Sequence, residues 1–113
     1  MKTSGVLVIG TSEVERPDGS EAAPAENILK AGDYILSVNG EKVAEKEDLQ
    51  RLVQQNGAEK EILKINRKGE EVEVGVTPVQ NKNGTYMLGA WVRDDLAGIG
   101  TLTYYKEDGP MVL

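Results

Sequence analysis

Most hydrolytic sites are built from histidine, cysteine or an activated serine, and this sequence offers few of them. Its 113 residues include no histidine and no cysteine. The chain therefore lacks the usual general base near neutral pH, and it has no thiolate nucleophile, cysteine-built zinc site or disulfide. No serine has a histidine partner or lies in a Gly-x-Ser-x-Gly turn, and a Ser-Lys pair has no supporting motif. These serines are Ser4, Ser12, Ser20 and Ser37. We predict no catalytic residue in this chain.

Two segments near the C-terminal end resemble metal or phosphate sites, but neither has a complete donor set. Asp94 and Asp95 are adjacent carboxylates, whereas a calcium ion takes about six to eight oxygen ligands. We expect Asp94 to lie in a solvated turn or to pair with Arg93. Residues 98–101 (Gly-Ile-Gly-Thr) lack the Gly-Lys-Ser/Thr of a phosphate-binding loop, which favours close strand packing or a bulge. No metal and no cofactor are expected.

Charge and hydropathy limit the partners of the chain. The formal net charge is −6, and the 13 lysine and arginine residues are scattered along the sequence. Non-specific nucleic-acid binding needs a clustered basic surface, so nucleic acid is not an expected partner. No apolar run approaches the roughly 20 residues of a membrane-spanning helix, and the first residues lack the apolar stretch of a signal peptide. The length suits one domain of ordinary size.

The elements that must position any site follow from hydrophobic periodicity. Short apolar or alternating runs predict four strands, at residues 5–10, 33–38, 62–65 and 72–76. Apolar residues at helical spacing predict two helices, at residues 22–30 and 46–55. Asn39-Gly40 predicts a tight turn, and residues 67–70 predict a hairpin turn. The glutamates around the last two strands are expected on the wet face of the sheet; they are Glu59, Glu61, Glu70, Glu71 and Glu73.

This order of elements is similar to that of PDZ domains of the bacterial protease type. Gly-Asp-Tyr-Ile at residues 32–35 and Val-Asn-Gly at 38–40 carry the resemblance at the family's spacing. Ala-Pro-Ala at residues 23–25 and Asp-Leu at 48–49 fit the same pattern. The resemblance covers about residues 5–79. It implies an α+β fold, a small partly open β-barrel of about five strands with two helices, and a PDZ domain at residues 1–79.

The C-terminal third resembles a second family. Trp-Val-Arg-Asp at residues 91–94 and Ala-Gly-Ile-Gly-Thr-Leu-Thr at 97–103 are similar to the opening of the peptidase domain in the stage IV sporulation protein B family. Members of that family are PDZ-containing serine peptidases of endospore-forming bacteria. The resemblance implies that residues 80–113 are a linker and the first strands of a truncated peptidase domain. It also implies an exported parent in the forespore intermembrane space, with its targeting segment outside this chain.

A PDZ domain implies a groove in which a peptide's C-terminus lies as an added strand beside a helix. The groove helix here is the one predicted at residues 46–55. Its candidate peptide-binding residues are Lys46, Leu49, Leu52 and Val53. The three apolar residues have an alternative place in the protein's own core, because an amphipathic stripe first faces its own sheet.

The groove also needs a strand and a loop of converging backbone N–H groups. In bacterial PDZ domains these precede the strand predicted at residues 5–10, where only four residues remain. In PDZ domains with the other connectivity, the loop and strand follow a strand placed like residues 71–79. Residues 86–91 lie there and have the apolar-Gly-apolar pattern of such a loop. In this interpretation residues 87–92 fill the groove edge, so Met87, Leu88, Gly89 and Ala90 are further candidate peptide-binding residues. In the alternative, this segment pairs elsewhere, for example in a strand-exchanged homodimer, since an unpaired apolar edge invites exchange.

The leading hypothesis is a peptide-binding and regulatory PDZ module of a sporulation serine peptidase, inactive as this chain alone. Its expected partner is a protein or peptide C-terminus, or the parent's own peptidase domain. One alternative is a stand-alone PDZ adaptor whose last segment completes the groove. Another is the PDZ domain of an HtrA-type envelope protease. The segment at 91–103 favours the sporulation family, because in HtrA proteins the PDZ domain follows the protease.

Overall fold

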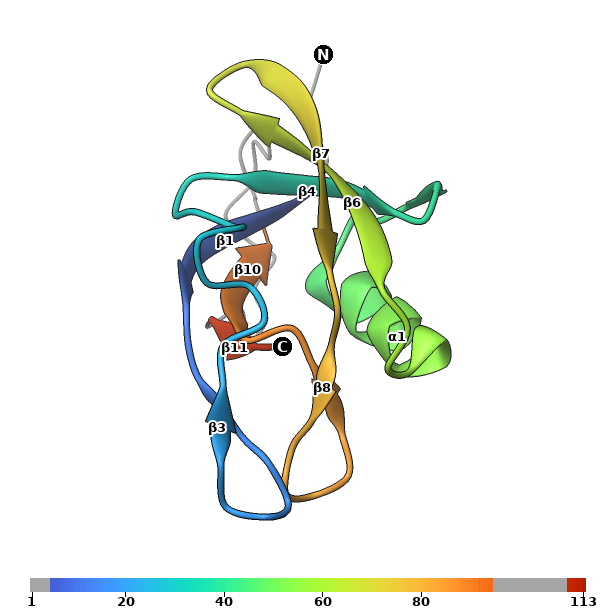
Figure 1. Ribbon diagram of the computed structural model, residues 1–113. Coiled ribbons are helices and arrows are strands. Elements are labelled where there is room, and N and C mark those ends of the chain that lie inside the picture. The colour runs from blue at the N-terminus through green and yellow to red at the C-terminus, as the bar shows by residue number, and fades with distance from the viewer. Residues whose placement is uncertain (1–4, 95–109) are drawn as a thin grey trace, which may run out of the picture.

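The structure is a computed structural model that describes residues 5–94 and 110–113 (Figure 1). The glycine-rich run at 98–101, the rest of the segment at 97–103, and Asp95 lie outside these residues. The described chain has one helix and eleven strands: β1 (Val6–Thr11), β2 (Val14–Glu15), β3 (Glu21–Ala22), β4 (Tyr34–Val38), β5 (Glu41–Lys42), α1 (Lys46–Asn56), β6 (Glu61–Arg67), β7 (Glu70–Val76), β8 (Val79–Gln80), β9 (Tyr86–Met87), β10 (Ala90–Asp94) and β11 (Met111–Val112). Within the described ranges, no helix is long and apolar enough to cross a membrane.

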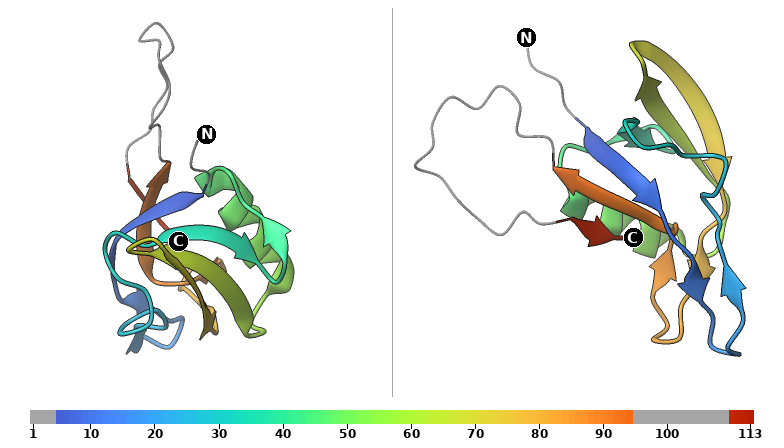
Figure 2. Two further views of the ribbon diagram at one scale, coloured as in Figure 1. Left: turned by 90° about the horizontal axis from the view of Figure 1, so that it is seen from above. Right: turned by 90° about the vertical axis from the view of Figure 1, so that its left-hand side faces the viewer.

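The main sheet has seven strands, and every pair in it is antiparallel. Its strands lie in the order β11-β10-β1-β4-β6-β7, and β5 pairs with β4. The sheet curves without closing, since β11 and β7 stay at its two ends (Figure 2). Two small hairpins, β2–β3 and β8–β9, project together at one end of the molecule (Figure 1). The expected PDZ-like fold is present, but it is mostly β, with more strands than the five predicted.

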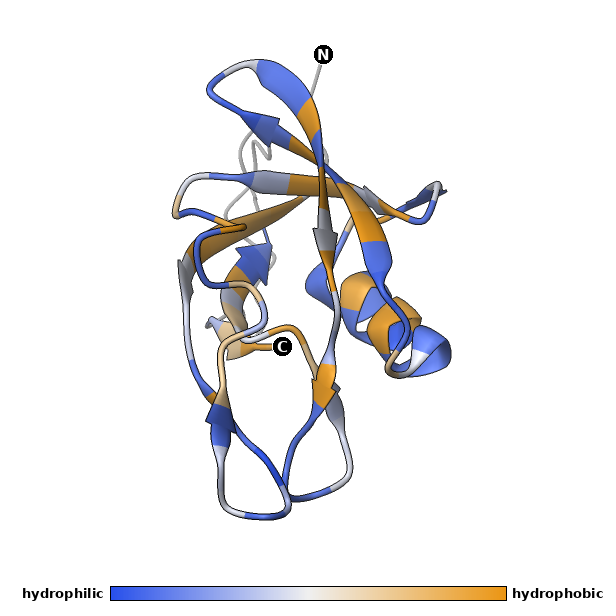
Figure 3. Ribbon diagram, viewed as in Figure 1, coloured by the Kyte–Doolittle hydropathy of each residue, from blue (hydrophilic) through white to orange (hydrophobic). Residues whose placement is uncertain are grey.

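The core lies between the curved sheet and α1. Alternate residues of the strands face inward, as expected from the period of two in a strand. On the helix, an apolar stripe of Leu49, Leu52 and Val53 faces the same interior. Figure 3 shows apolar segments along the strands and on one stripe of α1, with hydrophilic hairpin tips. The other fully buried apolar residues of the cluster include Val6, Val8, Ile35, Leu63, Ile65, Leu88 and Val92.

The Gly-Asp-Tyr-Ile motif holds a loop against the sheet. The side chain of Asp33 is almost fully buried and accepts hydrogen bonds from Arg67 on β6, at 3.0 Å from Nε and 2.8 Å from Nη2. It also accepts from the backbone N–H of Lys30 at 2.9 Å. Burial alone would raise the pKa of Asp33, but the hydrogen bonds and charge of Arg67 outweigh burial and lower that pKa. The motif's aspartate is therefore a structural anchor.

The Val-Asn-Gly motif makes a tight turn that also joins two strands. Asn39 and Gly40 both have positive φ, at 50° and 87°, which is the backbone of a two-residue hairpin turn. The side-chain oxygen of Asn39 accepts from the N–H of Ile62 at 2.8 Å, and the N–H of Asn39 donates to the carbonyl of Ile62 at 2.8 Å. The turn predicted from the sequence is present, and its asparagine pairs with β6 as a backbone group would.

The helix predicted at residues 22–30 is absent. This segment forms successive turns, with Leu29 donating to the carbonyl of Ala25 at 3.0 Å. Asn27 has a φ of 65°, which interrupts a right-handed helix. The carbonyl of Ile28 accepts from Arg67, and the N–H of Gly32 donates to Val8 on β1 at 2.8 Å. These backbone groups bond to other elements instead of to each other. Ala25 and Leu29 are therefore buried in the core although the segment is not helical.

One of the five glutamates expected on the wet face is in the core. Glu61 is fully buried and follows the inward alternation of Leu63 and Ile65 along β6. Burial raises its pKa from 4.5 to about 7, and an interaction with Asn56 opposes this only in part. Within the described residues, neither of its carboxyl oxygens makes a hydrogen bond of ordinary geometry. The other four glutamates are exposed, as predicted.

Candidate functional site

The candidate site is the region between β10 and α1, where the PDZ resemblance implies a peptide groove, and we call this region the groove. Strand β10 forms one side of the groove and pairs with β1, Val92 opposite Val8 and Ala90 opposite Thr11. The other edge of β10 pairs with β11, with Trp91 opposite Val112. Leu113, the residue after β11, is buried in the same apolar cluster as Leu49, Leu52 and Val53 of α1. The site thus brings together β10, the helix and the short strand β11.

A loop with converging N–H groups closes one end of the groove. The backbone N–H groups of Gly89 and Ala90 both donate to the main-chain oxygen of Leu113, at 2.5 Å and 3.0 Å. The N–H of Leu113 donates back to the carbonyl of Ala90 at 2.8 Å. Two neighbouring backbone donors aimed at one oxygen make a small concave site that suits an anionic or carbonyl oxygen.

A buried ion pair joins the two walls at the other end. Asp94, the last residue of β10, accepts from the backbone N–H of Lys46 at 2.7 Å and from its Nζ at 3.2 Å. Both side chains are almost fully buried. Burial by itself would lower the pKa of Lys46, but the hydrogen bond and charge of Asp94 outweigh burial and raise it. The expectation of a solvated turn or an Arg93 pair for Asp94 is wrong, because Asp94 faces inward at the helix N-terminus.

A second tie lies near the C-terminal end of α1. The side-chain amide of Gln54 donates to the carbonyl of Tyr86 at 2.7 Å, and its oxygen accepts from the N–H of Tyr86 at 3.2 Å. The side chain of Gln54 thus pairs with both the N–H and the carbonyl of Tyr86, as a residue on a neighbouring strand would. Together with the Lys46–Asp94 pair, this contact fixes the helix against the β9–β10 segment at both ends.

These features can be compared with known proteins. A family model described as a PDZ domain matches residues 17–67, which hold both sequence motifs and α1. The chain contains a PDZ domain. A second family model, described as SpoIVB peptidase S55, matches residues 84–111. The two matches follow one another along the chain, and the second covers β9, β10 and the start of β11 of the sheet just described.

A solved structure and a curated protein add to these matches. The crystal structure of the PDZ domain of the SdrC-like protein from Listeria monocytogenes has a TM-score of 0.63 and 18% sequence identity. The likeness covers 81% of this chain and 90% of that chain, and it shows the fold alone. The protein named "Probable protease eep" of Enterococcus faecalis (strain ATCC 700802 / V583) is 30% identical over 111 residues. That match covers 96% of this chain and 24% of the relative, so the chain spans about a quarter of its length.

The candidate peptide-binding residues predicted from the sequence are all buried or half-buried. On the helix, Leu49, Leu52 and Val53 are buried in the core, and Lys46 is buried against Asp94. In the loop, Leu88, Gly89 and Ala90 are buried, and Met87 is half-buried on β9. The loop residues face the groove through their backbone. Sequence reasoning did not find Asp94, Gln54 or residues 111–113 as parts of the groove, since all three contact residues distant in the chain.

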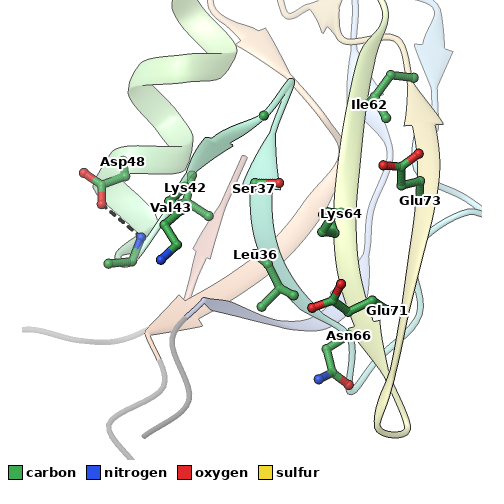
Figure 4. A pocket seen from close by; sticks show the side chains of 12 residues that line it. Leu36, Ser37, Lys42, Val43, Asp48, Ile62, Lys64, Asn66, Glu71 and Glu73 are labelled. Carbon is green, nitrogen blue, oxygen red and sulfur yellow. Dashed lines mark hydrogen bonds between the residues drawn. The ribbon is translucent and has the colours of Figure 1, made fainter.

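One concave surface of the described chain lies away from the groove. It has a volume of about 770 Å³ and lies on the outer face of β4, β6 and β7 (Figure 4). Its lining mixes apolar and polar residues and includes two lysines and two glutamates, Lys42, Lys64, Glu71 and Glu73. In the described part of the chain, no cluster of three or more acidic residues could hold a metal ion. The groove itself is filled, because β11 lies along β10.

Gly89 makes the loop geometry possible, which leads to a first prediction. Its φ is +79°, and an added Cβ would lie 2.7 Å from the backbone oxygen of Ser12 and 3.1 Å from Pro24. We expect Gly89→Ala to lower the free energy of unfolding by at least about 2 kcal/mol, from left-handed strain plus a backbone clash. Urea unfolding followed by circular dichroism measures this loss.

The matched control is Gly19→Ala. Gly19 has a similar φ of +88°, but its added Cβ would meet nothing within 4 Å. Only the left-handed strain remains there, so the expected loss is about 1 kcal/mol. Equal losses at the two positions would show that the close approach of the Gly89 loop to Ser12 is unimportant.

Proposed function

We propose that this chain is the peptide-recognition and regulatory PDZ module of a SpoIVB-type serine peptidase. The observation that carries the proposal is the pair of N–H groups of Gly89 and Ala90 at the end of a strand edge beside α1. PDZ domains in general bind peptide C-termini or other protein domains, and the added strand uses main-chain hydrogen bonds. The match to the SpoIVB peptidase model after the PDZ match supports the peptidase parent, in the order expected for that family rather than for HtrA proteins.

In this proposal the ligand's main chain pairs with β10 and its terminal carboxylate sits at the Gly89–Ala90 N–H groups. The apolar wall from Leu49, Leu52 and Val53 then receives the ligand's last side chain. Lys46 takes part by fixing the helix against Asp94 rather than by direct contact with peptide. The parent acts outside the cytoplasm, where the PDZ module captures the tail of a target or restrains its own peptidase domain.

A stand-alone adaptor is the second candidate, and one observation favours it. The segment that matches the peptidase model contributes β10, the strand next to β1 in the PDZ sheet. A segment that completes the PDZ domain need not begin a peptidase. Reading the natural gene beyond the codon for Leu113 separates the two: a Gly-His pair and a downstream serine support the peptidase, whereas a stop codon supports the adaptor.

Peptide binding is tested by titrating the ¹⁵N-labelled chain with a library of C-terminal peptides. We expect the amide signals of Gly89, Ala90 and Leu49 to shift with at least one peptide, because they lie at the proposed contact. Signals at the tip of the β6–β7 hairpin, such as Gly69, serve as the control and should stay unchanged. Leu113 bonds to Gly89 and Ala90, so the titration is repeated on a Leu113→Asp variant. If no peptide shifts the groove signals of either protein, the hypothesis that this chain binds peptides is wrong.

A further inference from the structure

The last residues of the described chain lie in the groove as a peptide strand. Met111 pairs with Val92 and Val112 with Trp91, antiparallel to β10. Leu113 completes the strand with three backbone hydrogen bonds to Gly89 and Ala90, of 2.5 Å, 3.0 Å and 2.8 Å. The backbone pairing with β10 is the one that the preceding section assigns to the main chain of a bound peptide, here made by the protein's own chain.

Side-chain burial follows the same pattern. Leu113 is 3% exposed and belongs to the cluster that contains Leu49, Leu52 and Val53. Met111, two positions earlier, packs against that cluster and is half-buried. Residues two apart on a strand share a face, so Val112 points the other way. It lines a shallow hollow with Met87 and Trp91. Two apolar side chains thus enter the groove from one face of the strand.

We propose that residues 111–113, Met-Val-Leu, are an intramolecular ligand that occupies the PDZ groove and must be displaced by any other peptide. The inference rests on the proposed peptide-binding function and names a ligand for it. It also names the ligand chemistry: a leucine at the Gly89–Ala90 loop and a second apolar side chain two residues before it.

Tethering gives such a ligand an advantage over free peptides. A ligand joined to its site by a short connection acts at an effective concentration on the order of 1 mM. Residues 95–109 connect β10 to this segment. Free peptides of equal intrinsic affinity therefore compete poorly at micromolar concentrations. We expect the apparent Kd of the unchanged chain for a free peptide to exceed that of an emptied groove by about tenfold or more.

The test measures binding of a fluorescently labelled synthetic peptide with the sequence of residues 108–113, Asp-Gly-Pro-Met-Val-Leu. The groove is emptied by Leu113→Asp, which puts a charge among apolar side chains. Pro110→Asp is the matched control, since it adds the same charge at an exposed residue. We expect Leu113→Asp to bind the peptide about tenfold more tightly than the unchanged chain and the control do. The emission of Trp91, the chain's one tryptophan, should also move to longer wavelength as Val112 leaves it.

The possible outcomes separate the two proposals. Equal, measurable affinities for all three proteins would overturn the intramolecular ligand and leave peptide binding intact. No binding by any of them, with folding shown by circular dichroism, would overturn the proposed function and this inference with it.

A second measurement needs no substitution. In hydrogen exchange on the unchanged chain, the amides of Ala90 and Leu113 should be protected at every protein concentration, with a monomer by light scattering. Protection that grows with concentration alongside a dimer would mean that the segment enters the groove of a second copy, which overturns the intramolecular form. Unprotected amides at all concentrations would show an unoccupied groove.

Discussion

Replacing Asp94 by alanine will lower the free energy of unfolding by about 3 kcal/mol, because it removes the buried carboxylate that pairs with the buried Lys46 ammonium. The lost contacts are the 3.2 Å pair with Nζ and the 2.7 Å hydrogen bond from the Lys46 N–H at the start of α1. Glu47, at 3.4 Å from the same Nζ, is half-exposed and compensates only weakly. Urea unfolding at pH 7 measures the change.

The pair Asp48–Arg51 provides the control. Its atoms lie 3.5 Å apart on the same helix, but the arginine side chain is 56% exposed, so Arg51→Ala should cost less than about 0.5 kcal/mol. The double variant Lys46→Met/Asp94→Leu should lose only about 1 kcal/mol, because it removes both charges and leaves one helix N–H without its acceptor. A loss for Asp94→Ala no larger than that for Arg51→Ala would contradict the buried pair.

The same substitution also tests the groove. Asp94 fixes the N-terminal end of α1 to β10, so its removal frees the two walls to move apart. We expect Asp94→Ala to weaken peptide binding in the Leu113→Asp background even at temperatures where the domain remains folded. Arg51→Ala should leave that affinity unchanged.

Glu61→Gln will make the protein more stable than the unchanged chain at pH 8, by about 3 kcal/mol, and equally stable at pH 4. Burial raises the folded pKa of Glu61 from 4.5 to about 7. Because the folded pKa lies above the unfolded one, the folded state holds the proton more tightly. The stability that this gives is complete below pH 4.5 and is lost as the pH rises towards 7, at about 1.4 kcal/mol per pKa unit.

The control for this prediction is Glu73→Gln on β7. Glu73 is exposed on the outer face of the sheet, so removing its charge should change stability by less than about 0.5 kcal/mol at either pH. Comparing each variant with the unchanged chain cancels the pH dependence of other groups, such as Asp33 with its lowered pKa. Parallel pH profiles for Glu61→Gln and the unchanged chain would contradict the burial of an unpaired carboxyl group.

Much of the fold could be predicted from local sequence. The helix α1 starts at the predicted residue and ends one residue after the predicted end, because its apolar stripe has a helical period and Gly57 follows it at φ 63°. The turns at Asn39-Gly40 and Lys68-Gly69 were predictable since both need positive φ. The loop at Gly89 was also a candidate from its apolar-Gly-apolar pattern.

The burial of Glu61 was within reach of the same logic. Glu61 stands two residues before Leu63 and four before Ile65, so the period of two places it on their face. As a charged residue Glu61 is expected in solvent, whereas its position in the alternation of β6 places it in the core. The register prevailed because turning one side chain outward would require a bulge in a strand that pairs along its whole length with β7.

Other features depend on residues far apart in the chain. The apolar spacing at 22–30 is helical, but a helix there would pair the carbonyl of Ile28 with the N–H of Gly32. In the structure the Ile28 carbonyl accepts from Arg67, and the Gly32 N–H donates to the carbonyl of Val8. Asp94 meets Lys46 across 48 positions, and no sequence period links them. The pairing of residues 111–113 with β10 likewise joins segments that no local sequence pattern connects.

The sequence by itself determined the local elements, their periods, the turn residues and the motifs by which the PDZ domain is recognised. Only the tertiary structure decided that β10 lies beside β1, that a buried ion pair fixes the groove helix, and that residues 111–113 lie along β10. The reason is physical: turns and periods are set by neighbouring residues, whereas these contacts form when the folded sheet brings distant backbone donors, acceptors and charges together.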